Sequence, residues 1–161
     1  RDKTVAEWDI REDGRIVGVT EELSAQEIYD MGRKVEPFVI AKDTRMGHIH
    51  LSVKDSQLAS AFYQEVLELA DKFTIPSASW IASGDYHHHL AVNEWGGKDL
   101  AKREEDMSGL AYYVLEVEDK EDLIAIAERA NNRGAEVKWL SSNVLTFENN
   151  DGILTRIRKK Y

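Results

Sequence analysis

The chain contains no cysteine. Disulfide bonds, cysteine-ligated zinc sites and cysteine nucleophiles are therefore excluded. Because disulfide-free proteins suit a reducing compartment, we expect the protein in the cytoplasm. Long apolar runs are lacking as well, and none approaches the roughly 20 residues that a membrane-spanning helix needs. We therefore expect no membrane partner.

Concentrated positive charge is also missing. The 21 lysines and arginines are outnumbered by 30 aspartates and glutamates, which gives a formal charge of −9. The basic residues cluster only at 156–160, near the end of the chain. Nucleic-acid binding relies on clustered positive charge that displaces counterions from phosphates. We therefore expect no nucleic-acid partner.

What is present is globular composition, with 42% hydrophobic and 32% charged residues. Residues 1–46 predict an arm or connector rather than a core of their own. Short strands are predicted at TVAEW and RIVGV, and Ser24 with Glu27 resembles a helix-capping box. Since the chain starts with what looks like ordered protein and not with Met, we expect a C-terminal fragment of a longer protein.

An internal repeat fills residues 47–161. The first copy, 47–95, reads as strand GHIHLSV, a helix, and strands DKFTI, SASWIAS and HHHLAVN. The second copy, 109–161, reads as strand GLAYYVLEV, a helix, and strands EVKWL, NVLTFEN and GILTRIRK. A polar linker, 96–108, separates them. The predicted fold class is α+β, with paired β-α-β-β-β modules forming a curved half-barrel sheet and helices outside.

Each predicted helix has an apolar face at helical spacing. These faces are Leu58, Ala61, Phe62 and Val66 in the first copy and Leu123, Ile126, Ala127 and Ala130 in the second. Asp55 and Asp119 stand where the helices begin and are predicted N-caps.

Strand alternation predicts which side chains face the concave side of the sheet. Ile49, Leu51 and Val53 should meet the helix, so His48 and His50 should point the other way. Aligning LSVKD with LEVED places Tyr112 opposite His48 in the repeat. Tyr112 is expected on the same concave face, and so is Arg156 of the last strand.

The remaining histidines, His87, His88 and His89, form one run. Alternation along a strand turns His87, His89 and Asn93 inward, whereas a different gap placement selects His88. Histidine serves metal ligation, proton transfer and hydrogen bonding near neutral pH. The residue pattern alone leaves these roles open, together with that of ordinary strand residues.

The chain resembles the vicinal oxygen chelate superfamily, which includes glyoxalase I and the extradiol ring-cleavage dioxygenases, in its paired modules and in the segments GHIHLSVKD and AFYQEVL. SGDYHHHLAVNEW resembles the C-terminal domain of the catechol 2,3-dioxygenase type. The resemblance implies a preceding paired-module domain, of which residues 1–46 are the end and the connector. It also places the family's substrate-binding or proton-transferring histidine within His87–His89.

The resemblance further implies Fe(II) or Mn(II) held by two histidines and a carboxylate. His48 matches the first histidine, but Tyr112 stands at the second histidine position, and Arg156, in DGILTRI, at the carboxylate position. A guanidinium is permanently cationic and offers only hydrogen-bond donors. We therefore expect a degenerate iron site without a bound cofactor.

Two functions follow as hypotheses. The first is a domain that is structural or binds a small aromatic or anionic molecule in a pocket made of His48, His50, Asn93, Tyr112 and Arg156. The second is an active ring-cleavage dioxygenase or glyoxalase-like enzyme that uses Fe(II) or Mn(II) with shifted ligands, namely His48, His50 and a member of His87–His89. A homodimer is compatible with both.

Overall fold

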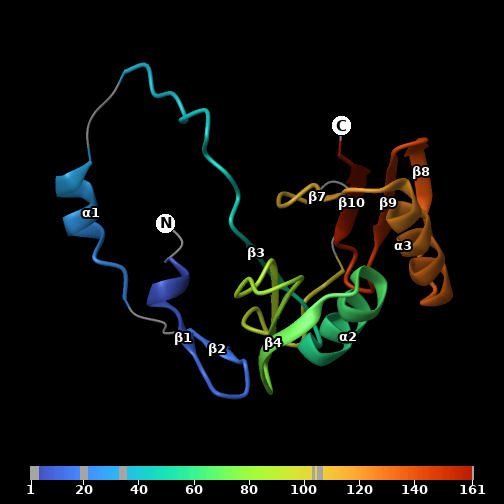
Figure 1. The fold of residues 1–161 in the computed structure, drawn as a ribbon, viewed down its shortest axis with the longest axis horizontal. Helices are drawn as coiled ribbons and strands as arrows, with labels where there is room; N and C mark the ends of the chain where they lie inside the picture. The colour runs from blue at the N-terminus through green and yellow to red at the C-terminus, as the bar shows by residue number, and fades with distance from the viewer. Residues whose placement is uncertain (1–3, 19–21, 33–35, 103, 105–106, 161) are drawn as a thin grey trace. The chain divides into compact units, whose positions relative to one another are not determined.

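The computed structural model describes residues 4–18, 22–32, 36–102, 104 and 107–160. The chain divides into two compact units, residues 1–47 and residues 48–161 (Figure 1). Within the described ranges, no helix is both long and apolar enough to cross a membrane.

The first unit has little regular structure. It contains a 3-10 helix (Val5–Glu7), two short antiparallel strands, β1 (Asp9–Ile10) and β2 (Ile16–Val17), and helix α1 (Ala25–Met31). The strand predicted at TVAEW is wrong, because Glu7 accepts hydrogen bonds from the backbone and hydroxyl of Thr4 and closes a helical turn there. Ser24 does stand at the N-cap of α1, but its side chain makes no capping hydrogen bond.

The second unit contains the repeat. Its first module consists of β3 (Ile49–Ser52), α2 (Ser56–Leu67), β4 (Ala70–Ile75), β5 (Ala78–Ala82) and β6 (Leu90–Asn93). Its second module consists of β7 (Tyr113–Val117), α3 (Lys120–Asn132), β8 (Lys138–Ser141), β9 (Val144–Glu148) and β10 (Leu154–Lys159). The sheet orders are β3-β6-β5-β4 and β7-β10-β9-β8. The predicted α+β class and its β-α-β-β-β modules are confirmed.

Both modules place their first and last strands side by side in parallel. Ile49 of β3 lies opposite Leu90 of β6, and Tyr113 of β7 lies opposite Thr155 of β10. A parallel pair needs a crossover connection, and the chain between these strands supplies it with one helix in each module. The repeat is therefore one of three-dimensional topology as well as of sequence.

A single apolar core joins the two modules. Leu51 and Val53 are buried whereas His50 is exposed, and Tyr113 is buried whereas Tyr112 is exposed, so the predicted strand faces are correct. The core residues from both modules are Leu51, Val53, Phe62, Tyr63, Val66, Leu123, Ile126, Leu145, Phe147 and Ile157, among others. Helices α2 and α3 contact each other.

The buried face of α2 differs in part from the prediction. Phe62 and Val66 are buried as expected, but Leu58 is 62% exposed and Ala61 is exposed as well. The hydroxyls of Ser60 on α2 and Ser79 on β5 share a buried hydrogen bond of 2.7 Å. A buried hydroxyl needs a hydrogen-bond partner, and each of these two supplies one to the other. Ala59 and Tyr63 are buried on the same face of the helix. All four residues of the predicted face of α3 are buried.

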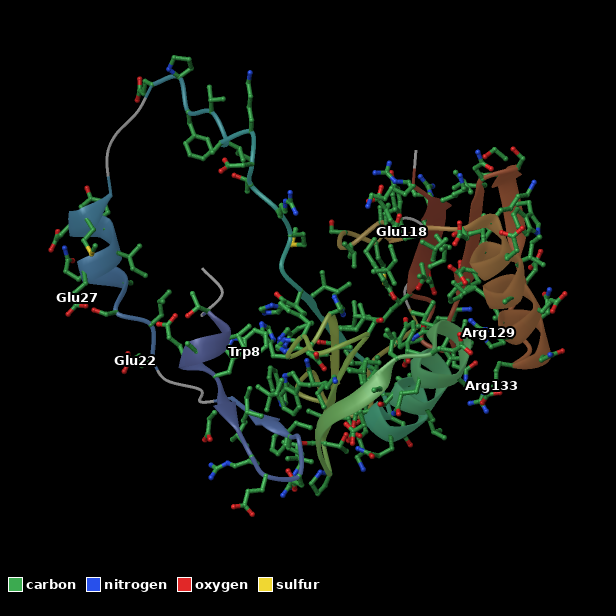
Figure 2. The ribbon with its side chains drawn as sticks, viewed as in Figure 1. Trp8, Glu22, Glu27, Glu118, Arg129 and Arg133 are labelled. Atoms are coloured by element: carbon green, nitrogen blue, oxygen red, sulfur yellow. The ribbon has the colours of Figure 1, made fainter. Side chains whose placement is uncertain are left out.

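Two arginines near the C-terminal end of α3 contact the C-terminal end of α2 (Figure 2). Arg129 donates from Nε to the backbone oxygen of Val66 at 2.9 Å and pairs with Glu68 at 3.3 Å. Arg133 pairs with Glu65 at 3.1 Å. The last carbonyls of a helix lack partners within the helix, so a cation there satisfies them and complements the helix dipole.

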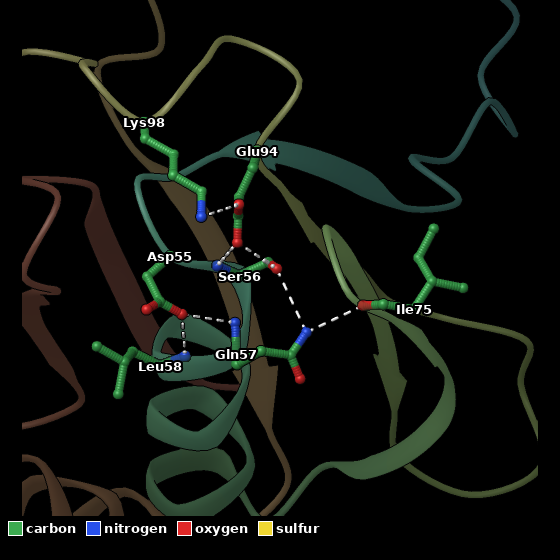
Figure 3. A network of polar contacts seen from close by, with 7 residues as sticks. All are labelled: Asp55, Ser56, Gln57, Leu58, Ile75, Glu94 and Lys98. Carbon is green, nitrogen blue, oxygen red and sulfur yellow. Dashed lines mark hydrogen bonds and ion pairs between the residues drawn. The ribbon is translucent and has the colours of Figure 1, made fainter.

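The start of α2 is tied to the end of β6 (Figure 3). Asp55 caps the helix by accepting from the backbone nitrogens of Gln57 and Leu58 at 3.0 and 2.9 Å. Glu94, directly after β6, accepts from the backbone nitrogen and the hydroxyl of Ser56 at 3.0 and 2.9 Å. These hydrogen bonds from Ser56 lower the pKa of the Glu94 carboxyl. The network holds Glu94, and with it the start of the loop after β6, against the first turn of α2.

The two N-cap aspartates provide a matched test. Asp119 stands at the N-cap of α3 as predicted, but its side chain makes no capping hydrogen bond, whereas Asp55 makes two. Asp55→Ala is expected to lower the free energy of unfolding by about 1–2 kcal/mol. Asp119→Ala should cost only a few tenths of that amount. Urea unfolding followed by circular dichroism measures both, and equal losses would contradict the assignment.

Candidate functional site

The three consecutive histidines lie beside the start of β3. The backbone oxygen of His89 accepts from the nitrogen of Ile49 at 3.1 Å, and the nitrogen of His89 donates to the oxygen of Ile81 at 2.9 Å. Because β6 begins at Leu90, the run precedes the strand rather than belonging to it. The sequence-based alternation through His87 and His89 therefore does not apply to these residues.

His88 is the member of the run that lies closest to both His48 and His50. The Nε2 atoms of His50 and His88 are 3.2 Å apart, and the rings of His48 and His88 have centroids 4.2 Å apart. One ring nitrogen from each of the three side chains lies within 4.8 Å of the others. The structure thus brings together three imidazoles, two from the start of β3 and one from the segment before β6.

His87 and His89 have different surroundings. His87 and His88 are linked through their Nδ1 atoms at 2.7 Å. Nδ1 of His89 accepts instead from the backbone nitrogen of Ser83 at 3.2 Å. The ring of Tyr86 lies against both, with centroids 4.2 Å from His87 and 4.8 Å from His89. Sequence reasoning did not single out Ser83 or Tyr86, and their closeness to the histidine run was the only signal.

Burial favours the uncharged form of two of these imidazoles. Partial burial lowers the pKa of His50, and the neighbouring His48 lowers it further. Partial burial also lowers the pKa of His89, with smaller contributions from His87 and Lys72. A neutral imidazole keeps one nitrogen lone pair, which can accept a hydrogen bond or coordinate a metal.

Asn93, a predicted pocket residue, is 3% exposed at the end of β6. Its side-chain oxygen accepts from the backbone nitrogen of Trp95 at 3.2 Å. The Trp95 ring has its centroid 6.1 Å from that of His50. Asn93 therefore shapes the loop that places Trp95 near the histidines.

In the second module, Arg156 stacks on Tyr112. The guanidinium carbon lies 3.8 Å from the centroid of the Tyr112 ring, and Tyr112 is 42% exposed. Nε of Arg156 is buried and has no hydrogen-bond acceptor among the described residues. Glu116 does not reach Arg156, because it pairs with Arg158 at 2.6 and 2.7 Å.

The residues at the three positions of the family's iron site do not fit an iron ion held by two histidines and a carboxylate. Of the set His48, Tyr112 and Arg156, only His48 is an imidazole, and Arg156 directs its cationic group over Tyr112. A guanidinium has no lone pair for a metal and repels it. His48 also belongs to a second group, in which it lies with His50 and His88 as three nitrogen donors of the first module.

The comparisons with known proteins agree with this architecture. The family model described as the Glyoxalase/Bleomycin resistance protein/Dioxygenase superfamily matches residues 45–139. A catechol-2,3-dioxygenase of Bacillus subtilis strain 168 is 29% identical over 139 residues, which is 85% of this chain and 49% of that protein. The chain thus spans about half the length of this curated relative.

Solved structures share the fold at low identity. A glyoxylase/bleomycin resistance protein/dioxygenase domain from Frankia is 20% identical, with a TM-score of 0.58 over 73% of this chain and 98% of that one. The fosfomycin resistance protein FosX from Listeria monocytogenes, solved with Mn(II) and sulfate, is 15% identical, with a TM-score of 0.55 over 73% of this chain and 91% of that one. By its matched family model and its paired modules, the chain belongs to the glyoxalase/bleomycin resistance protein/dioxygenase superfamily.

Proposed function

We propose that this superfamily domain binds a planar aromatic anion on the exposed sheet face of the second module. We also propose that His48, Tyr112 and Arg156 do not bind an iron ion. The observation that carries the proposal is Arg156, whose buried Nε has no acceptor among the described residues and whose guanidinium covers Tyr112. A buried donor gains a partner when a ligand oxygen reaches it.

The chemistry of this pair favours an aromatic ligand that carries a carboxylate or phenolate. A guanidinium forms charge-assisted hydrogen bonds with such oxygens. The Tyr112 ring is 42% exposed and offers apolar surface beside the cation. Arg158, two residues along β10, is already neutralised by Glu116, so Arg156 is the cation available to an anion on this part of the strand.

The test is isothermal titration calorimetry of the chain with 3,4-dihydroxybenzoate, benzoate and cyclohexanecarboxylate in the presence of a chelator. We expect saturable binding of the two aromatic acids and weaker binding of the saturated ring. Arg156→Gln should weaken binding about 10–100-fold, because a hydrogen bond to a charged group contributes roughly 1.5–3 kcal/mol.

Arg158→Gln is the matched control, since it removes a cation from the same strand that already has a carboxylate partner. It should leave the affinity near that of the unsubstituted chain. The proposal fails if none of the acids binds saturably, or if Arg156→Gln and Arg158→Gln have the same effect.

A further inference from the structure

The three imidazoles of His48, His50 and His88 are spaced as metal ligands are. Tetrahedral zinc with nitrogen ligands at 2.0–2.1 Å holds neighbouring nitrogens about 3.3 Å apart. The Nε2 atoms of His50 and His88 are 3.2 Å apart, so two positions of such a site already exist. The ligand nitrogens of all three residues lie within 4.8 Å of one another, so no pair needs to approach by more than about 1.5 Å to reach this spacing.

The surroundings of the three side chains hold them in this arrangement. His87 contacts Nδ1 of His88 at 2.7 Å, which leaves Nε2 of His88 directed at His50. A partner on the second ring nitrogen is how metal-binding histidines are commonly oriented. The backbone bond between Ile49 and His89 keeps the two segments together, and the exposed His50 leaves the site open to solvent.

From this geometry we propose that His48, His50 and His88 form a three-histidine site for a divalent transition metal ion of the zinc class. The donor set contains no carboxylate, which disfavours magnesium and calcium, whereas imidazole suits zinc, copper, nickel and iron. Three protein ligands leave a fourth position for water. The site goes beyond the proposed anion-binding face, because it uses neither Tyr112 nor Arg156.

The experiment is a titration of the untagged chain with Co²⁺, a spectroscopic substitute for zinc, followed by competition with Zn²⁺. We expect one equivalent to bind with the intense visible bands of a four-coordinate ion, and Zn²⁺ to remove them. His50→Ala and His88→Ala should each lower the affinity by more than the 10–100-fold that loss of an orienting partner causes. His87→Ala, a positioning variant, should fall within that 10–100-fold range.

His89→Ala is the matched control, because its Nδ1 is occupied by the Ser83 backbone and it lies outside the three-residue set. It should bind Co²⁺ like the unsubstituted chain. Circular dichroism establishes that each variant is folded. The proposal is overturned by a chain that takes up no Co²⁺, by the spectrum of a six-coordinate ion, or by binding that survives His50→Ala and His88→Ala. None of these results bears on Arg156→Gln, so the two proposals fail separately.

Discussion

Phe147→Ala is expected to lower the free energy of unfolding by about 3–5 kcal/mol. Phe147 is 1% exposed on β9, and its ring centroid lies 5.9 Å from that of Phe62 on α2. The substitution therefore opens a cavity where the first module packs on the second, and surrounding side chains fill such a cavity only in part. Urea unfolding followed by circular dichroism measures the loss.

Leu140→Ala is the control, because Leu140 on the neighbouring β8 is 53% exposed. An exposed position of this kind should change stability by no more than about 0.5 kcal/mol. Since both modules share one core, residues 48–161 should still unfold in a single transition. Separate transitions for the two modules, or similar losses in both variants, would contradict the shared core.

The second large effect is a loss of stability at alkaline pH. Burial raises the pKa of Tyr63 from 10.0 to about 12. Burial, with Tyr63 beside it, also raises the pKa of Tyr113. The unfolded chain releases the Tyr63 proton near pH 10 while the folded chain keeps it, so stability is fully present below about pH 10 and falls above it. For Tyr63 the slope approaches about 1.4 kcal/mol per pH unit between the two pKa values, and the loss reaches about 2.3 kcal/mol at pH 12.

Urea unfolding at intervals between about pH 9 and 12 measures this slope. Tyr63→Phe removes the titrating group and should reduce the slope by about 1.4 kcal/mol per pH unit. Tyr112→Phe removes a phenol that is 42% exposed and serves as the matched control. An unchanged slope in Tyr63→Phe would show that the Tyr63 hydroxyl reaches solvent in the folded chain.

Much of the fold follows from local patterns. The alternation of Ile49, Leu51 and Val53 with His48 and His50 predicts the correct strand faces, because a sheet with one covered face must turn its apolar side chains toward the helix. In α2, however, local spacing predicts the buried face only in part. Leu58 fits the apolar spacing but is 62% exposed, since α2 packs against β5 and α3 with a face that includes Ala59 and Tyr63 instead.

For the candidate site too, the sequence predicts some features and the tertiary structure decides the others. The composition, the repeat and the strand faces bring the histidines, Tyr112 and Arg156 into consideration, and for these features the sequence alone suffices. Only the tertiary structure assigns the partners. In the parallel pair, Arg158 lies opposite Glu116 and binds it, while Arg156 lies opposite Val114 and stacks on Tyr112 instead. Cross-strand pairing depends on register, which the alternation of a single strand does not contain.

Only the tertiary structure shows that His88, and not its neighbours in the histidine run, lies against both His48 and His50. Alternation selects His87 and His89, but these residues precede β6 and do not follow the geometry of a strand. The end of the run is fixed by backbone hydrogen bonds of His89 to Ile49, on a different strand, and to Ile81, at the end of the loop. The sequence by itself determined that histidines gather at this sheet. Which three imidazoles meet was decided by long-range contacts, because outside a regular element no local period sets the direction of a side chain.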